Sequence, residues 1–338
     1  MKDKHLVRNI FIAITLSLSA LVLIGKGKLF AALKKIPSIP FYIWAIGISL
    51  IIIKWFVEGL TFYILIREKG YKPKYLSIVK FVVASYLFHY ITPFQSGGQA
   101  FQIYYLSLME IPPGIATGII VMRSLMFQIA IILGIILGIP AIRKVGHIKL
   151  GKFAWLAFFL ALMLILIYAL FSSRRVWRSK PVKGIRALLH KKYTSFYRKI
   201  ASELMLFRKM WRTTKHSTVI LGALLSFVQM VLFISPLIVV IHYLERDINI
   251  ISTFELALIA DIIGGLIPTP GGSGGVEGAM TIILTAAGIQ TANALLAVGI
   301  WRIIAYYMPI TAGMIALLLS GIDNPEDFIG KKEHIQKQ

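Results

Sequence analysis

The chain lacks cysteine altogether and is poor in acidic residues. With no cysteine among its 338 residues, disulfides, Cys-ligated zinc sites and thiol catalysis are excluded. Only 14 aspartates and glutamates oppose 37 lysines and arginines, and charged residues make up 15% of the chain. An ordinary soluble domain has about 25% charged residues. The chain therefore carries too little polar surface to fold as soluble domains of this length.

Sequence motifs of several enzyme classes are also absent. The chain has no G-x-x-x-x-G-K-[ST], which excludes a P-loop ATPase, and no H-E-x-x-H zinc motif. Gly272-x-Gly274 is followed by Glu277 where a dinucleotide-binding motif requires a third glycine, and the seven histidines are scattered. We therefore expect no cofactor, no metal site and no catalytic residue.

What the chain has in abundance is apolar residues. They make up 57% of the sequence and give a mean hydropathy of +0.78. A membrane-spanning helix needs about 20 mainly apolar residues. Six stretches qualify: Asn9–Ile24, Phe41–Ile66, Pro113–Leu137, Phe153–Phe171, Ser217–Ile241 and Thr291–Ser320. The sequence therefore predicts an all-α polytopic membrane protein in which residues 1–338 form a single transmembrane domain.

Two further apolar stretches are interrupted by proline and glycine. The first covers residues 77–108 and is broken at Thr92–Gly98, and the second covers residues 252–288 and is broken at Pro268–Gly275. Clusters of proline and glycine end helices, and each half is too short to cross a membrane. Irregular backbone inside a bilayer is tolerated only where protein or a cavity surrounds it. Both stretches are therefore predicted to be re-entrant, broken-helix hairpins.

The two breaks resemble each other in sequence. Thr92–Gly98 reads TPFQSGG and Thr269–Gly275 reads TPGGSGG, so five of seven positions are identical at a separation of 177 residues. An arginine follows the serine of each motif, Arg123 by 27 residues and Arg302 by 29. The agreement in both the motif and the spacing to arginine indicates an internal duplication.

The order of the predicted spans gives the topology. Three full spans separate the hairpins, and an odd number means that the hairpins enter the membrane from opposite faces. This predicts an inverted repeat of residues 1–138 and 217–320, a common plan of secondary transporters. One face of the membrane holds 24 lysines and arginines and the other holds 8. The positive-inside rule therefore predicts a multi-pass protein of the cell membrane with both termini cytoplasmic.

Residues 172–216 form the one long polar segment. It contains fourteen lysines and arginines but a single acid, Glu203, and its apolar residues recur at near-helical spacing. This pattern predicts an amphipathic helix on the anionic inner leaflet, within a basic cytoplasmic segment. Contact with nucleic acid, such as a tRNA, is the less favoured alternative.

Charged residues inside a bilayer are costly and usually functional. The chain has six at predicted membrane depth: Lys54, Glu58, Arg123, Asp261, Glu277 and Arg302. Lys54 and Glu58 lie four residues apart on one helix, so we expect them to pair with each other. Arg123 and Arg302 have no acid nearby in sequence. Their expected partners are Asp261, Glu277 or a ligand anion.

The half-helix after each break offers a place for an anion. Its first backbone N–H groups lack helical partners, the helix dipole is positive there, and glycines let a phosphate approach the backbone closely. The predicted lipid-binding or anion-binding residues are Thr92, Pro93, Ser96, Gly97, Gly98, Gln99, Arg123, Thr269, Pro270, Ser273, Gly274, Gly275 and Arg302. Asp261 and Glu277 are predicted to couple protons or charge. The alternative is that the glycines only permit close packing and that the acids form structural ion pairs with the arginines.

At these motifs the chain resembles the transmembrane region of the lysylphosphatidylglycerol synthase/flippase family. The resembling residues are Ile91–Gln99 with Gln102–Tyr105, Pro268–Gly278, Trp301-Arg302, Tyr306-Tyr307 and Pro309. In that family a membrane domain moves aminoacylated phosphatidylglycerol between leaflets, and a C-terminal cytoplasmic domain makes this lipid from aminoacyl-tRNA. This chain ends eighteen residues after its last predicted helix, so we expect no synthase domain and no enzymatic activity of the chain by itself.

The resemblance implies a lipid flippase or transporter. Its substrate would be an anionic phospholipid, either aminoacyl-phosphatidylglycerol or a related polar or isoprenoid lipid, bound between the two Gly-rich re-entrant loops. One alternative is a phosphatidylglycerol lysyltransferase, or its membrane subunit, in the aminoacyl-lipid synthesis that gives resistance to antimicrobial peptides. Another is a small-anion secondary transporter. The expected partners are membrane phospholipids, with a separate synthase or a second copy of the chain as further alternatives.

Overall fold

The protein is helical throughout most of the part that the structure describes. The computed structural model describes residues 27–93, 95–144 and 194–320, together with residues 15–16, 19–23, 159, 162, 163 and 166. Within these residues there is no β-sheet, and an isolated antiparallel bridge joins Pro93 and Pro270 of two loops. The predicted all-helical fold class is thereby confirmed for the described residues.

Four helices are long and apolar enough to cross a membrane. They are α3 (Phe41–Glu68), α6 (Pro113–Lys144), α11 (His216–Leu244) and a continuous helix made of α14 (Thr291–Arg302), the π-helical turn η2 (Ile303–Tyr307) and α15 (Met308–Ser320). Four of the six predicted spans are confirmed as helices of spanning length. The other two, Asn9–Ile24 and Phe153–Phe171, are described only in part, at residues 15, 16 and 19–23 of the first and at residues 159, 162, 163 and 166 of the second.

Two pairs of shorter helices occupy the predicted broken stretches. The first pair is α4 (Tyr75–Ile91) with α5 (Ser96–Leu108), and the second is α12 (Ile250–Gly265) with α13 (Gly275–Ala286). The two helices of each pair pack against each other. Each broken stretch therefore folds into a helical hairpin, as its sequence predicts.

Proline and glycine determine where these hairpins break. Thr92 is extended, as a residue before proline prefers, so α4 ends before Pro93. In the second break Gly271, Gly272 and Gly274 have φ values of 58°, 67° and 85°, a region that glycine enters without steric cost. The first break is shorter than predicted, because its two glycines take helical torsion angles and α5 begins at Ser96, before the predicted Gln99.

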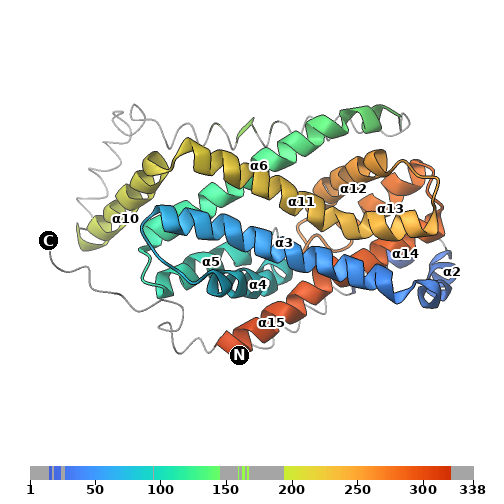
Figure 1. Cartoon of the computed structure of the whole chain (residues 1–338), viewed down its shortest axis with the longest axis horizontal. Coiled ribbons are helices and arrows are strands. Elements are labelled where there is room, and N and C mark those ends of the chain that lie inside the picture. Colours follow the sequence, from blue (N-terminus) through green and yellow to red (C-terminus); the bar gives the residue numbers. More distant parts are fainter. Residues whose placement is uncertain are drawn as a thin grey trace.

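The hairpins lie at opposite ends of the molecule and meet at its centre. Figure 1 shows α3 and α11 side by side along the long axis, with α4 and α5 toward one end and α12 and α13 toward the other. The loop of one hairpin contacts the loop of the other through the antiparallel bridge between Pro93 and Pro270. In addition, α6 packs against α12 and α15 packs against α4. The helix that follows each hairpin therefore lies against the first helix of the other hairpin.

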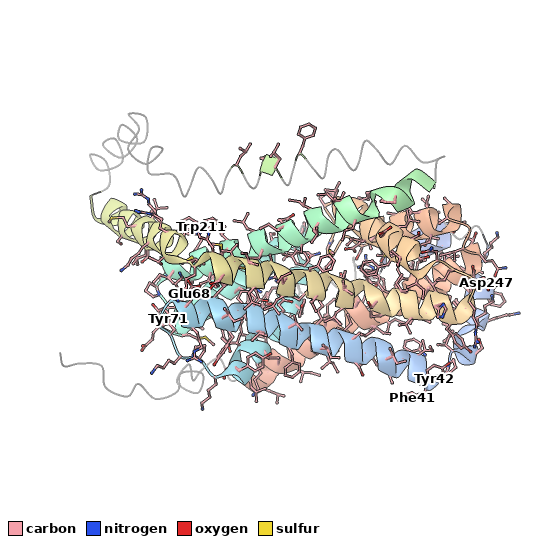
Figure 2. The ribbon with its side chains drawn as sticks, turned by 45° about the horizontal axis from the view of Figure 1, so that its top comes forward. Phe41, Tyr42, Glu68, Tyr71, Trp211 and Asp247 are labelled. Atoms are coloured by element: carbon pink, nitrogen blue, oxygen red, sulfur yellow. The ribbon has the colours of Figure 1, made fainter. Side chains whose placement is uncertain are left out.

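The two ends of the long helices carry aromatic and charged residues. Figure 2 shows Tyr42 and Asp247 at one end, and Glu68 and Tyr71 at the other. Aromatic and charged side chains are enriched where membrane helices reach the lipid head groups and water. The long axis of the molecule therefore has the composition expected of a direction across a membrane.

Helix α10 (Thr194–Thr213) packs against the first turns of α6. The carboxylate of Glu203 accepts a hydrogen bond from the backbone N–H of Gly114, and a Cβ atom at Gly114 would lie 2.1 Å from the carbonyl oxygen of Glu203. A helix is thus confirmed in this part of the basic segment, while residues 172–193 lie outside the described residues. The contact of α10 with the inner leaflet remains a prediction.

Gly264 allows the two helices of the second hairpin to pack closely. A Cβ atom at Gly264 would lie 2.3 Å from the Cα atom of Val276, whereas a Cβ atom at the neighbouring Gly265 would meet nothing within 4 Å. We expect Gly264→Ala to lower the free energy of unfolding by about 1–3 kcal/mol, because the obstructing atoms are backbone and must move. Gly265→Ala is the matched control and should be neutral or slightly stabilising. Thermal unfolding in detergent micelles measures both, and equal effects of the two substitutions would contradict this packing.

Candidate functional site

A cavity of about 160 Å³ lies at the centre of the fold, beside the meeting point of the two loops. Residues from α3, α4, α6, α11, α12, α13, α14 and η2 line it, so both hairpins and all four long helices contribute. Its polar lining residues are Lys54, Glu58, Tyr86, His89, Tyr90, Gln95, Arg123, Asp261, Arg302 and Tyr306. A polar cavity this deep among apolar helices is where a ligand-binding site is expected.

Glu58 organises the charged side chains on one side of the cavity. Its carboxylate accepts hydrogen bonds from Lys54 Nζ, 3.3 Å away, from the hydroxyl of Tyr86 and from Nη2 of Arg123. Glu58 is 2% exposed. The pairing of Lys54 with Glu58 is therefore confirmed. The acid that pairs with Arg123 is Glu58, not the expected Asp261 or Glu277, because α3 and α6 come into contact here. A ligand anion as a further partner of Arg123 stays a prediction.

Glu277 pairs with the arginine on the opposite side of the cavity, Arg302. Arg302 and Glu277 form a two-pronged ion pair in which Nε and Nη2 of the arginine each lie 2.9 Å from a carboxylate oxygen. The guanidinium group of Arg302 also donates hydrogen bonds to the backbone. Nη1 lies 3.3 Å from the carbonyl oxygen of Gly271, and Nη2 lies 3.4 Å from that of Gly272. Both Glu277 and Arg302 are buried. This arginine therefore fastens the second Gly-rich loop to α14.

The start of α13 already holds an anion, which is the carboxylate of Glu277. The backbone N–H of Gly274 donates to Glu277 Oε2 over 2.8 Å, as expected for an acid in the first turn of a helix. Ser273 does not cap this helix, since its hydroxyl donates to the carbonyl of Pro270. Thr269 donates to the carbonyl of Ser273, and Gly275 packs closely on the carbonyl of Gly264. These contacts hold the loop together from within.

The first Gly-rich loop is also bonded internally. The hydroxyl of Thr92 accepts from the backbone N–H of Gly97, and the hydroxyl of Ser96 donates to the carbonyl of Pro93 instead of capping α5. A Cβ atom at Gly98 would lie 2.1 Å from the ring of His89, so this glycine leaves room for a cavity-lining side chain. Gln99 is exposed.

Of the predicted site residues, the structure brings three to the cavity wall: Arg123, Asp261 and Arg302. The predicted residues of the two loops are not among the lining residues, although their neighbours Gln95 and Gly271 are. The binding of an anion by the loop residues stays a prediction. In the described part of the chain, no group of three histidine, aspartate or glutamate side chains is placed to hold a metal ion.

Asp261 differs from the other acids of the site. It projects from α12 into the cavity and is partly exposed, and in the described part of the chain it makes no ion pair within 4 Å. Glu58 and Glu277, by contrast, each form an ion pair with an arginine and accept at least two hydrogen bonds. Asp261 is therefore the carboxylate of the site that is available to a proton or to a ligand.

Tyr306 connects the last turn of α4 to the second loop. Its hydroxyl lies 2.9 Å from the carbonyl oxygen of Tyr90 and 3.2 Å from that of Pro270. It belongs to the π-helical turn η2, which directly follows Arg302, and such turns are common at functional sites. A Cβ atom at Gly271 would lie 2.0 Å from the Tyr306 ring. The π turn thus brings an arginine and a tyrosine, four residues apart, onto the same loop.

Sequence reasoning missed several polar residues at the site. Tyr86, His89 and Tyr90 line the cavity from one face of α4, and Gln229 of α11 donates to Thr61 over 3.0 Å and lies 3.5 Å from Nη2 of Arg123. The signal was present in the sequence. A spacing of three and four residues between polar side chains in an apolar helix places them on one face, and a glutamine in the middle of an apolar span requires partners.

Comparison with known proteins agrees with this architecture. The family described as "Lysylphosphatidylglycerol synthase TM region" matches residues 10–313 of the chain. The UPF0104 membrane protein MJ1595 of Methanocaldococcus jannaschii is 26% identical over 265 residues, which cover 75% of this chain and 78% of the relative. The match to the family extends over both hairpins, over α3, α6 and α11, and over the fourth long helix as far as residue 313.

Proposed function

Because the chain belongs to the lysylphosphatidylglycerol synthase TM region family, we propose that it binds the anionic head group of a membrane lipid in the central cavity and moves that lipid between leaflets. The observation that carries this proposal is the placement of Arg123, Arg302 and Lys54 around one cavity between two helical hairpins. One guanidinium group can donate two parallel hydrogen bonds to two oxygens of a phosphate group. A phosphate group is therefore the ligand chemistry that the cavity wall suits.

The arrangement of helices favours an inverted repeat around this cavity. The first half would be α3 to α6 and the second α11 to α15, each with one hairpin and one arginine-bearing helix. Two observations support it: α6 packs on α12 as α15 packs on α4, and the loop tips meet at Pro93 and Pro270. With the two further predicted spans, Asn9–Ile24 and Phe153–Phe171, the protein would have six spans, two re-entrant hairpins and cytoplasmic termini in the cell membrane. Rocking of one half against the other would open the cavity to each leaflet in turn.

The charges of the site suggest how movement is driven. Three cations, Lys54, Arg123 and Arg302, face three carboxylates, so the site has no excess positive charge while every acid is ionised. A proton on Asp261 would leave one positive charge in excess and would favour an anionic head group. Glu277 is committed to Arg302 and to the start of α13, so we assign proton coupling to Asp261 rather than to Glu277.

Proteoliposomes test this assignment. We expect the protein to move fluorescent phosphatidylglycerol between leaflets, and a proton gradient to accelerate the movement. Asp261→Asn should abolish the acceleration, because an amide in this place takes up no proton at neutral pH. Asp247→Asn, at an exposed acid on the end of the molecule, is the matched control and should retain it. An unchanged gradient dependence in the Asp261→Asn protein would contradict the coupling role.

The same preparation separates the lipid transporter from its alternatives. Transfer of an aminoacyl group from tRNA to phosphatidylglycerol by the purified chain would establish a lysyltransferase. Movement of a soluble anion such as phosphate, without movement of lipid, would establish a small-anion transporter. The proposal expects neither reaction.

A further inference from the structure

A second cavity, of about 500 Å³, lies between α6, α11 and α12. Its lining is apolar except at Ser235, His242 and Glu255. Leu137 and Ile251 on its lining are 50% and 71% exposed with respect to the described residues. Since α6 and α11 are both long and apolar enough to span a membrane, the opening of this cavity beside Leu137 and Ile251 would face bilayer hydrocarbon.

Two side chains separate this apolar cavity from the central charged one. Met230 of α11 and Leu258 of α12 line both cavities, and both are buried. They rest against Gly134 of α6, where a Cβ atom would lie 2.6 Å from Leu258 Cδ2 and 2.8 Å from Met230 Cε. The partition therefore consists of the flexible ends of two side chains, and methionine adapts its shape readily.

We propose that the apolar cavity receives a hydrocarbon chain of the lipid whose anionic head is held in the central cavity, and that Met230 and Leu258 move aside to join the two. This inference rests on the proposed function and adds to it the route of the chain and the class of substrate. The substrate is an amphiphile with a phosphate group and at least one long hydrocarbon chain. Phospholipids and isoprenyl phosphates share this chemistry.

The composition of the cavity favours a hydrocarbon chain over a segment of protein. A protein segment at membrane depth must satisfy its backbone polar groups, and this wall offers three polar side chains. A hydrocarbon chain has no hydrogen bonds to satisfy. The cavity also adjoins the charged site through a two-residue partition, which places a chain and a phosphate of one molecule within reach of each other.

Photolabelling in nanodiscs tests the inference with three probes. The first is phosphatidylglycerol with a diazirine near the end of one acyl chain, the second is a polyprenyl monophosphate with a diazirine in its chain, and the third is a diacylglycerol with the chains of the first. We expect a phosphate-bearing probe to label α11 and α12 around Val231 and Phe254, and the diacylglycerol to label them far less. The phosphate probe that labels identifies the source of the chain.

A substitution that fills the apolar cavity, compared with the same substitution on an exposed face, tests where the probe binds. Ser235→Trp occupies the cavity and should remove the phosphate-dependent labelling. Leu224→Trp introduces the same side chain on the exposed face of α11 and should preserve it. If Ser235→Trp does not fold, a photoreactive amino acid at Val239 of the otherwise unchanged chain gives the answer. Lipid adducts at Val239 support the inference, whereas adducts to residues 145–193 or to a second copy show that protein fills the cavity and overturn it.

The results also separate this inference from the proposed function. Equal labelling by diacylglycerol and by the phosphate probes, or labelling that survives Ser235→Trp, overturns the chain route. The proposed function still stands in that case if the protein retains phosphate-bearing lipid in preference to diacylglycerol during purification. If that preference is absent as well, the proposed function fails together with the inference.

Discussion

Replacing Glu58 by glutamine is expected to lower the free energy of unfolding by about 3–5 kcal/mol, the usual cost of removing one partner from a buried ion pair. Glu58 is the shared acceptor of Lys54, Tyr86 and Arg123. Without its charge, two cations remain buried close together and repel each other. Thermal unfolding in detergent micelles measures the loss.

Two further variants show that the cause is charge. Glu68→Gln makes the same change at the end of the same helix, where the side chain accepts from the backbone N–H of Lys215. It should cost less than Glu58→Gln, because the amide oxygen can still accept this hydrogen bond. Adding Arg123→Gln to Glu58→Gln should restore part of the stability, since one of the two unpaired cations is then gone. A Glu58→Gln protein as stable as the wild type would contradict the assigned cluster.

The second large effect is expected at Arg302. Arg302→Gln leaves Glu277 without a counter-ion at 0% exposure, which again costs about 3–5 kcal/mol. It also removes the donors that face the carbonyls of Gly271 and Gly272, so the second loop should loosen. We expect a large fall in melting temperature and increased proteolysis or hydrogen exchange in the loop between α12 and α13.

Arg67→Gln is the control for this prediction. Arg67 is exposed at the end of α3 and contacts the hydroxyl of Tyr63, so its loss should change the unfolding free energy by no more than about 0.5 kcal/mol. The double variant Arg302→Gln with Glu277→Gln should recover part of the stability, because two neutral amides can bond to each other. If Arg302→Gln alone leaves stability and loop exchange unchanged, the buried pair is not what holds the loop.

Local sequence signals predicted the helices well, but not all of the ion pairs. Length, hydropathy and the prolines at positions 93, 268 and 270 were enough to place four spans and two hairpins, since these features act through the neighbouring backbone. The duplicated motif also predicted that the hairpins are related. It could not show that their tips touch, because the bridge joins residues 177 positions apart and depends on how the long helices pack.

The partner of Arg123 shows why the site was harder to predict than the fold. Glu58 has Lys54 four residues away, and this local pair accounted for the charge of the acid. Glu58 was therefore not predicted as the partner of Arg123. In the folded chain the carboxylate has two oxygens to offer, and Arg123 reaches one of them across 65 residues of sequence. The link from Tyr306 to Tyr90 spans 216 residues. Contacts of this kind depend on how distant helices pack together. The sequence indicated only that some polar side chains in apolar helices had no local partner, and not which residues they would meet.

The most direct measurement of the central claim is native mass spectrometry of the protein in mild detergent, with identification of the lipids that remain bound. Arg123→Gln is the informative variant, because Glu58 keeps Lys54 and Tyr86 as donors when the arginine is removed, and Arg67→Gln is its control. We expect the wild type and the control to retain one class of phosphate-bearing lipid, and Arg123→Gln to lose it while remaining folded. Retention of bulk lipid in membrane proportions, unchanged by Arg123→Gln, would contradict the claim that the central cavity binds a lipid head group.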